Sequence, residues 1–179
     1  VIQIWDTRSW QLIDVFSGHG DSVTSLFFTR DGTRLITGSH DATVRVWDAA
    51  SGEVLDVMRR HNLAIWAMAV STDGETVVSG GIDGLICLWR PNDQQSGQAV
   101  HTLHGYVAPV FALAANHDGS LLATGERLGR IRLWNWAGSK PTTILLDGHT
   151  AMVDDVAFDL KGRLLASAGH DNRVRLWDI

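Results

Sequence analysis

Tryptophan recurs along this chain at a nearly constant interval, and no other feature constrains the fold as strongly. Five of the eight tryptophans are 42, 42, 45 and 43 residues apart, namely Trp5, Trp47, Trp89, Trp134 and Trp177. A period of this length indicates a repeated supersecondary unit, each copy of which buries its apolar face against the next. The 179 residues are therefore interpreted as about four similar units.

Other residue types recur at fixed distances before the last four of these tryptophans. Glycine lies 15 positions before them, as Gly32, Gly74, Gly119 and Gly162. A hydroxyl residue lies ten positions before, as Thr37, Ser79, Thr124 and Ser167. Aspartate lies six positions before and histidine 28 positions before, except in the third unit, which has Leu128 and Tyr106 there. The constant distance of 28 leaves no room for insertions inside a unit.

Each unit divides into short segments with the pattern of strands. In the first unit, residues 23–28 are apolar and β-branched, and Asp31-Gly32 is a hairpin turn signal. Residues 34–38, 42–47 and 53–58 follow as further strands, with apolar and polar residues alternating in the third. The later units repeat this order without any helical period, so the sequence predicts an all-β protein.

Repeats of this length, with Gly-His near the start and Trp-Asp at the end, resemble WD40 repeats. The Gly-His pairs are Gly18-His19 and Gly148-His149, and the Trp-Asp pairs include Trp47-Asp48 and Trp177-Asp178. The resemblance covers the whole chain and implies a β-propeller array over residues 1–179, with blades of four antiparallel strands. It places a partial repeat at 1–16 and repeats at about 17–48, 59–90, 104–135 and 147–179, each followed by its outer strand where present.

The resemblance also implies that four side chains of a blade hydrogen-bond in series, histidine to aspartate and to a hydroxyl, and the hydroxyl to the indole N–H. Three such networks are expected: His19, Thr37, Asp41 and Trp47; His61, Ser79, Asp83 and Trp89; and His149, Ser167, Asp171 and Trp177. A closed network of this kind satisfies polar groups that burial would otherwise leave unpaired. The third unit cannot form it as written. We expect Tyr106 and Leu128 to pack there instead, or the surface to be remade for a partner.

The number of blades is compatible with either a closed four-bladed ring or an incomplete ring. Residues 23–58, 65–104 and 108–147 supply complete blades, and residues 153–177 supply three strands of a fourth. If Gln11–Phe16 paired beside Val174–Trp177, a four-bladed ring would close, which is the lower limit for propellers. WD40 rings usually have seven or more blades, so we favour an incomplete ring. It would be a segment of a larger propeller, or a unit that forms homo-oligomers through its open blade edges.

Partners of WD40 proteins usually dock on the face that carries the loops before the first and third strands of each blade. In the second and third units this face collects the most apolar residues, and the candidate partner-binding set is Ala64, Trp66, Ile82, Pro109, Phe111 and Arg127. Exposed aromatic residues beside an arginine have the composition of a binding hot spot. The alternative is that Trp66 and Phe111 fill core space beneath the blades.

Composition narrows the class of function. The formal net charge of −5 disfavours nucleic acid as a partner. A single cysteine, Cys87, excludes an intrachain disulfide and a cysteine-rich zinc site, and suits a reducing compartment such as the cytoplasm. The apolar run 63–70 is far too short to cross a membrane. No metal site, cofactor or catalytic motif is expected.

These observations favour a non-catalytic protein-interaction scaffold or sensor module, of the kind used in signalling, that binds a protein or peptide. One alternative is an architectural or oligomerisation segment of a longer repeat protein. A hydrolase is a weaker alternative, because the serine, histidine and aspartate of a possible triad recur in several units together with a tryptophan that catalysis does not need.

Overall fold

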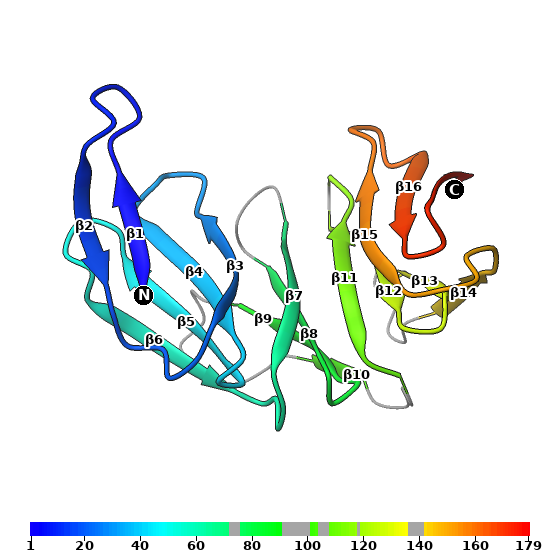
Figure 1. Cartoon of the computed structure of the whole chain (residues 1–179), viewed down its shortest axis with the longest axis horizontal. Coiled ribbons are helices and arrows are strands. Elements are labelled where there is room, and N and C mark those ends of the chain that lie inside the picture. The colour runs from blue at the N-terminus through cyan, green and yellow to red at the C-terminus, as the bar shows by residue number, and fades with distance from the viewer. Residues whose placement is uncertain (72–75, 91–100, 104–107, 118, 136–141) are drawn as a thin grey trace.

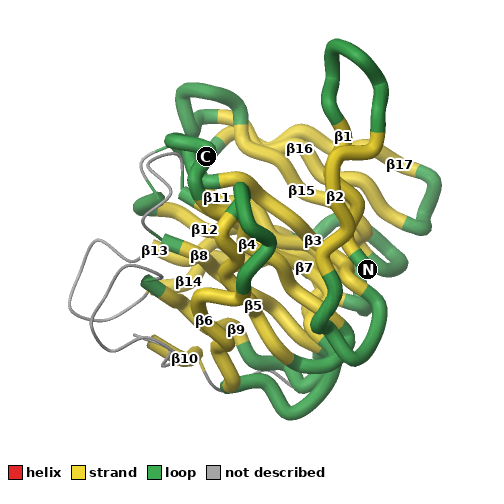
Figure 2. Tube along the Cα trace, turned by 90° about the vertical axis from the view of Figure 1, so that its left-hand side faces the viewer, coloured by secondary structure: helices red, strands yellow, loops and turns green. Residues whose placement is uncertain are grey.

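Each repeat unit forms a small antiparallel sheet whose strands follow one another in chain order. The computed structural model (Figure 1) describes residues 1–71, 76–90, 101–103, 108–117, 119–135 and 142–179. These residues form strands and loops with no helix (Figure 2). The all-β prediction and the prediction of blades of four antiparallel strands are confirmed.

The strands group into five sheets. An N-terminal pair contains β1 (Ile2–Trp5) and β2 (Leu12–Phe16). Blade 1 contains β3 (Val23–Phe28), β4 (Arg34–Ser39), β5 (Thr43–Asp48) and β6 (Val54–Arg59). Blade 2 contains β7 (Ile65–Val70), β8 (Val77–Gly81), β9 (Ile86–Trp89) and β10 (His101–Leu103). Blade 3 contains β11 (Val110–Ala115), β12 (Leu121–Glu126), β13 (Ile131–Asn135) and β14 (Thr142–Leu146). Blade 4 contains β15 (Val153–Phe158), β16 (Leu164–Gly169) and β17 (Arg173–Asp178).

The glycine 15 positions before each tryptophan closes the turn between the first and second strands. Gly32, Gly119 and Gly162 have φ values of 71°, 70° and 65°, a left-handed conformation that glycine adopts without strain. In blade 1 the carboxylate of Asp31 accepts hydrogen bonds from the Thr29 hydroxyl at 2.6 Å and from the Thr33 amide at 3.1 Å. Gly74 lies outside the described residues.

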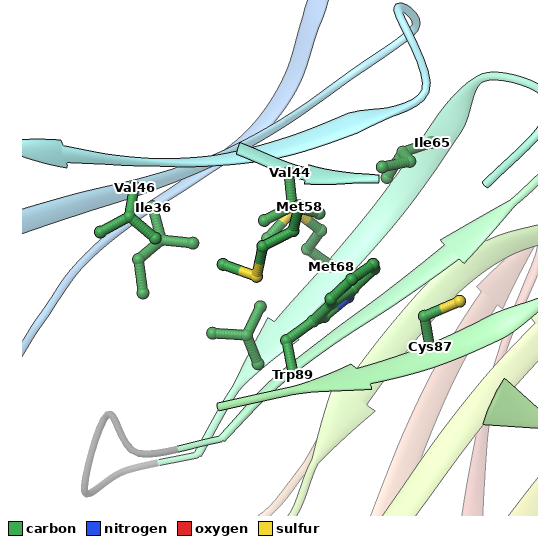
Figure 3. Packing of buried hydrophobic residues seen from close by; sticks show 9 residues of the cluster. Ile36, Val44, Val46, Met58, Ile65, Met68, Cys87 and Trp89 are labelled. Carbon is green, nitrogen blue, oxygen red and sulfur yellow. The ribbon is translucent and has the colours of Figure 1, made fainter. Parts of the chain in front are cut away.

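The core consists of apolar layers between neighbouring blades. Between blades 1 and 2, Met68 and Trp89 pack against Ile36, Val44 and Val46 (Figure 3). Close approach needs a small residue on the second strand of the preceding blade: a Cβ added at Gly38 would lie 2.2 Å from the Met68 sulfur. Gly80 and Gly125 make the same room for Val110 and Val153 of the next blades. The blades therefore stack through one repeated interface.

The two ends of the array stay apart. The blue N-terminal pair and the red blade 4 lie at opposite ends of the long axis in Figure 1. Among the described strands, β2 pairs with β1 and β17 pairs with β16, so Gln11–Phe16 does not pair beside Val174–Trp177. The closed four-bladed ring does not form, and the array is an open arc. The N-terminal pair packs on blade 1, where Ile2 and Phe16 cover Leu35 and Trp47.

Candidate functional site

Blade 1 carries a chain of hydrogen bonds from its surface loop to its buried tryptophan. Nδ1 of His19 lies 2.8 Å from Oδ2 of Asp41, and Nε2 lies 2.7 Å from Oγ1 of Thr37. The indole N–H of Trp47 donates to the same hydroxyl oxygen at 2.8 Å. Since a carboxylate only accepts, Nδ1 carries the imidazole proton, and the hydroxyl donates to Nε2. Every polar group in this series has a partner.

Blades 2 and 4 repeat this series with serine in place of threonine. The three distances, histidine to aspartate, histidine to serine and indole to serine, are 3.0, 2.8 and 2.8 Å in blade 2, and 2.8, 2.8 and 2.9 Å in blade 4. The residues are His61, Asp83, Ser79 and Trp89 in blade 2, and His149, Asp171, Ser167 and Trp177 in blade 4. The twelve side chains expected in networks therefore lie together in three groups of four.

The networks hold their aspartates ionised. Burial raises the pKa of Asp41, but hydrogen bonds from Thr43, the Gly20 amide and His19 outweigh burial and hold this pKa well below its usual range. The pKa values of Asp83 and Asp171 are lowered in the same way, each mainly by its histidine against the effect of burial. The pKa of His19 is lowered, because burial disfavours the imidazolium more than the Asp41 carboxylate favours it.

The serine hydroxyls of these networks are positioned for a structural role and not for nucleophilic attack. Ser79 and Ser167 are buried, and each accepts its hydrogen bond from a tryptophan that closes the series. A nucleophilic serine has to be reachable by its substrate, which these two are not. Burial also raises the pKa of the Cys87 thiol to about 12, so the reactive thiolate is not formed near neutral pH.

Blade 3 uses an ion pair in place of the histidine network. The expectation that Leu128 packs in the interior is wrong: this side chain is 69% exposed. The carboxylate of Glu126, which is only 1% exposed as a residue, accepts from Nε of Arg132 at 2.6 Å. The Trp134 indole still donates to Thr124, at a longer 3.3 Å. Tyr106 lies outside the described residues.

A recurring arginine in the sequence could have predicted this ion pair. Arg132 stands two positions before its tryptophan, as Arg45 and Arg175 do in blades 1 and 4. Those two arginines lie 3.8 Å from the network aspartates Asp41 and Asp171. With leucine at the aspartate position of blade 3, the same cation needs another anion. Glu126, two residues upstream of Leu128, supplies it.

Two of the candidate partner-binding residues, Trp66 and Phe111, lie at bulges at one end of the inner strands. The register of each inner strand shifts at its second residue, which is Thr24, Trp66, Phe111 and Asp154 in the four blades. A bulge redirects the side chain of the extra residue away from the regular ladder. The bulge therefore explains why residues within core strands can reach this face of the array.

Three aromatic rings from three successive blades meet on this face. The rings of His40 and Trp66 are stacked, with centroids 4.8 Å apart and planes inclined by 24°. Phe111 meets Trp66 edge-on, at 5.5 Å and 78°. Trp66 nevertheless remains 41% exposed. We call His40, Trp66 and Phe111 the aromatic patch; sequence reasoning named Trp66 and Phe111 as candidates but left His40 out of the set.

The remaining candidates differ in how far they are exposed. Ala64, Ile82 and Pro109 are half-buried, and the backbone N–H of Ile82 donates to the Ala64 carbonyl at 2.9 Å. Arg127 is exposed. On blade 4 two of the three corresponding positions are polar, with His170 3.2 Å from Asp154, and the third is Met152. The ring contacts of the aromatic patch thus lie on blades 1 to 3.

Within the described ranges, no three histidine, cysteine, aspartate or glutamate side chains are grouped as metal ligands would be. The described part of the chain also contains no helix with the length and apolar character needed to span a bilayer.

Comparison with known proteins agrees with the repeat analysis. The family model "WD domain, G-beta repeat" matches residues 10–48, 52–90, 97–135 and 139–178. An uncharacterised WD repeat-containing protein of Schizosaccharomyces pombe is 44% identical over 41 residues, which is 23% of this chain and 10% of that protein. The chain thus covers a small part of that relative's length. Because the family model matches most of the sequence in four successive copies, the chain belongs to the WD40 repeat family.

Proposed function

We propose that this chain is a non-catalytic protein-interaction module, and that the aromatic patch is where a protein or peptide partner docks. WD40 repeats generally mediate protein–protein interaction, which supports the class of function. The observation that carries the proposal is the 41% exposure of Trp66 between His40 and Phe111. A large aromatic side chain would be expected to lie deeper if it served the core alone.

The arrangement of the patch suits a hot spot. The indole is held on one side by a stacked imidazole and on another by an edge-on phenyl ring, so little side-chain entropy remains to be lost on binding. Tryptophan and arginine are the residue types most enriched at such positions. Arg127 is exposed in the turn after β12 of the same blade as Phe111, where it can meet an acidic group of the partner. The acidic net charge of −5 favours a protein over a nucleic acid.

The experiment is selection of peptides from a random display library on the full 179-residue chain. We expect enriched peptides to lose at least roughly tenfold in affinity for Trp66→Ala, since truncation of a hot-spot residue costs about 2 kcal/mol or more. Trp10→Ala is the matched control, because Trp10 is an exposed tryptophan on the loop between β1 and β2. Peptides that bind Trp66→Ala and the unmodified chain equally would refute the proposed site, as would a library that yields no binder.

A further inference from the structure

The strand β14 forms the outer edge of blade 3. It pairs with β13 on one side, and among the described strands none pairs with its other side (Figure 1). Blade 3 packs against blade 2 on one face and against blade 4 on the other, so this edge belongs to an interior blade. The outer edge of a sheet presents backbone N–H and C=O groups that can pair with a further strand.

The other described outer strands carry features that oppose such pairing. Both β2 and β6 contain a bulge and an aspartate, which is Asp14 in β2 and Asp56 in β6. Each aspartate accepts a hydrogen bond from the backbone N–H of the next residue at 2.7 Å. In the described part of the chain β10 is only three residues long. Charges, bulges and short length are the features by which edge strands are usually protected.

None of these features is present in β14. Its five residues, Thr-Thr-Ile-Leu-Leu, carry no charge, and their register with β13 is unbroken. Ile144 lies opposite Leu133, as Asp56 lies opposite Val46 in blade 1. Leu133 and Val46 each stand one position before the tryptophan of their blade. Ile144 therefore replaces the aspartate, and its side chain has no oxygen that could accept from the N–H of Leu145.

The side chain of Leu145 adds an apolar contact surface to this edge. Leu145 lies opposite Arg132, on the same face of the sheet as Trp134, which packs against blade 2. Although blade 2 is present on this face, Leu145 is 43% exposed. Thr143, two residues earlier, is also exposed. Threonine, isoleucine and leucine side chains suit cross-strand packing better than they suit an isolated edge in water.

We propose that β14 binds an extended peptide segment of a protein partner, which joins blade 3 as a fifth strand. Main-chain hydrogen bonds hold the segment, and an apolar side chain of the segment packs on Leu145. The middle of the segment is uncharged, because a charge placed against Leu145 would lose water without gaining a partner. A basic residue flanks the segment, since the exposed Asp147 directly follows β14 and the chain has a net charge of −5.

The length of the edge favours a peptide over a second folded copy as the occupant. The five residues of β14 span roughly 17 Å at about 3.3 Å per residue. A stable interface between two folded proteins uses about 20–30 residues on each side. A single strand can instead be matched in full by one extended segment. This edge is separate from the aromatic patch, so the proposal does not rest on the function proposed above.

The test measures binding of a short synthetic peptide of alternating threonine and valine, with a lysine at each end. Fluorescence anisotropy of the labelled peptide follows its binding to the full 179-residue chain. Ile144→Asp should weaken binding by roughly tenfold or more, because it restores the aspartate of β2 and β6. Leu160→Asp is the matched control, since it adds the same charge at a residue that is 91% exposed, and it should bind like the unmodified chain. Far-ultraviolet circular dichroism checks that both variants fold.

A methylated peptide tests the strand pairing without any change to the protein. The same peptide N-methylated at every threonine and valine keeps its side chains and loses its N–H donors, so it should bind roughly tenfold or more weakly. Hydrogen exchange should show added protection of the Thr143–Leu146 amides when the unmethylated peptide is bound, and none in β6. Equal binding of the two peptides, binding of neither, or protection outside β14 overturns the proposal.

Two further measurements identify other occupants and other sites. Trp66→Ala should leave binding of the peptide unchanged, and a loss of binding would place the peptide on the aromatic patch and overturn the proposal. Sedimentation velocity should show no association through β14. A dimer that is lost in Ile144→Asp would make a second copy of the chain the occupant and overturn the proposal in favour of self-association.

Discussion

Replacing Thr37 with valine should destabilise blade 1 through lost hydrogen bonds alone. The substitution keeps the branched shape and removes the hydroxyl that accepts from Trp47 at 2.8 Å and contacts His19 at 2.7 Å. Thr37 and Trp47 are fully buried, so the indole N–H and the imidazole nitrogen find no water to replace the lost partner. A buried polar group left unpaired costs about 1–3 kcal/mol. Two such groups predict a loss of about 2–6 kcal/mol in the free energy of unfolding.

Blade 3 offers the matched control for this substitution. Thr124 accepts from the Trp134 indole at 3.3 Å and has no network histidine described beside it, so Thr124→Val should cost about 1 kcal/mol. Urea unfolding followed by tryptophan fluorescence measures both, provided that the slope against denaturant is unchanged between variants. Equal losses for Thr37→Val and Thr124→Val, or a Thr37→Val loss below about 0.5 kcal/mol, would refute the argument that the series of hydrogen bonds stabilises the blade.

Two further predictions concern charge. The pKa values of His19, Asp41, Asp83 and Asp171 are lowered in the folded chain, so each group contributes stability above its unfolded pKa that is lost as the pH falls towards its folded pKa. Unfolding free energies measured from pH 8 to pH 3 should therefore fall first below about 6.5, from His19, and again below about 4, from the aspartates; a flat profile contradicts this. In blade 3, Arg132→Met should cost about 2–3 kcal/mol because it leaves the Glu126 carboxylate buried without its cation. Leu128→Ala should change the free energy of unfolding by less than about 0.5 kcal/mol, because Leu128 is exposed. If denaturant unfolding shows a larger loss for Leu128→Ala than for Arg132→Met, Leu128 is the stabilising residue and the ion pair is not.

The repeat period predicted most of the fold because each blade is a local unit with one set of constraints. Constant spacing fixed which residues share a blade, and therefore which histidine could reach which aspartate. The ion pair of blade 3 was not predicted in this way, because Leu128 replaces the expected aspartate and Glu126, which takes over its role, is not at one of the recurring positions. Alignment of the repeats identifies residues at matching positions. When a residue at a neighbouring position takes over a missing role, only the three-dimensional structure shows it.

The aromatic patch and the exposed residues Leu26 and Val174 show a second limit of sequence reasoning. Alignment placed Trp66 and Phe111 on one face but could not tell exposed rings from core rings, because that depends on the bulge after Ile65 and on the His40 ring from the preceding blade. The exposure of Leu26 and Val174 likewise depends on which of the described strands lie against them. Both features arise between blades, where the repeat period carries no information.

Denaturant unfolding of Trp66→Ala is the most direct test of the proposal that Trp66 is a surface residue available to a partner. Because Trp66 is 41% exposed and its ring meets those of His40 and Phe111 at this surface, we expect a loss of at most about 1.5 kcal/mol in the free energy of unfolding. A tryptophan that fills the core would lose about 3–5 kcal/mol on the same truncation. A loss in that higher range would contradict the proposed binding site and leave Trp66 as a structural residue.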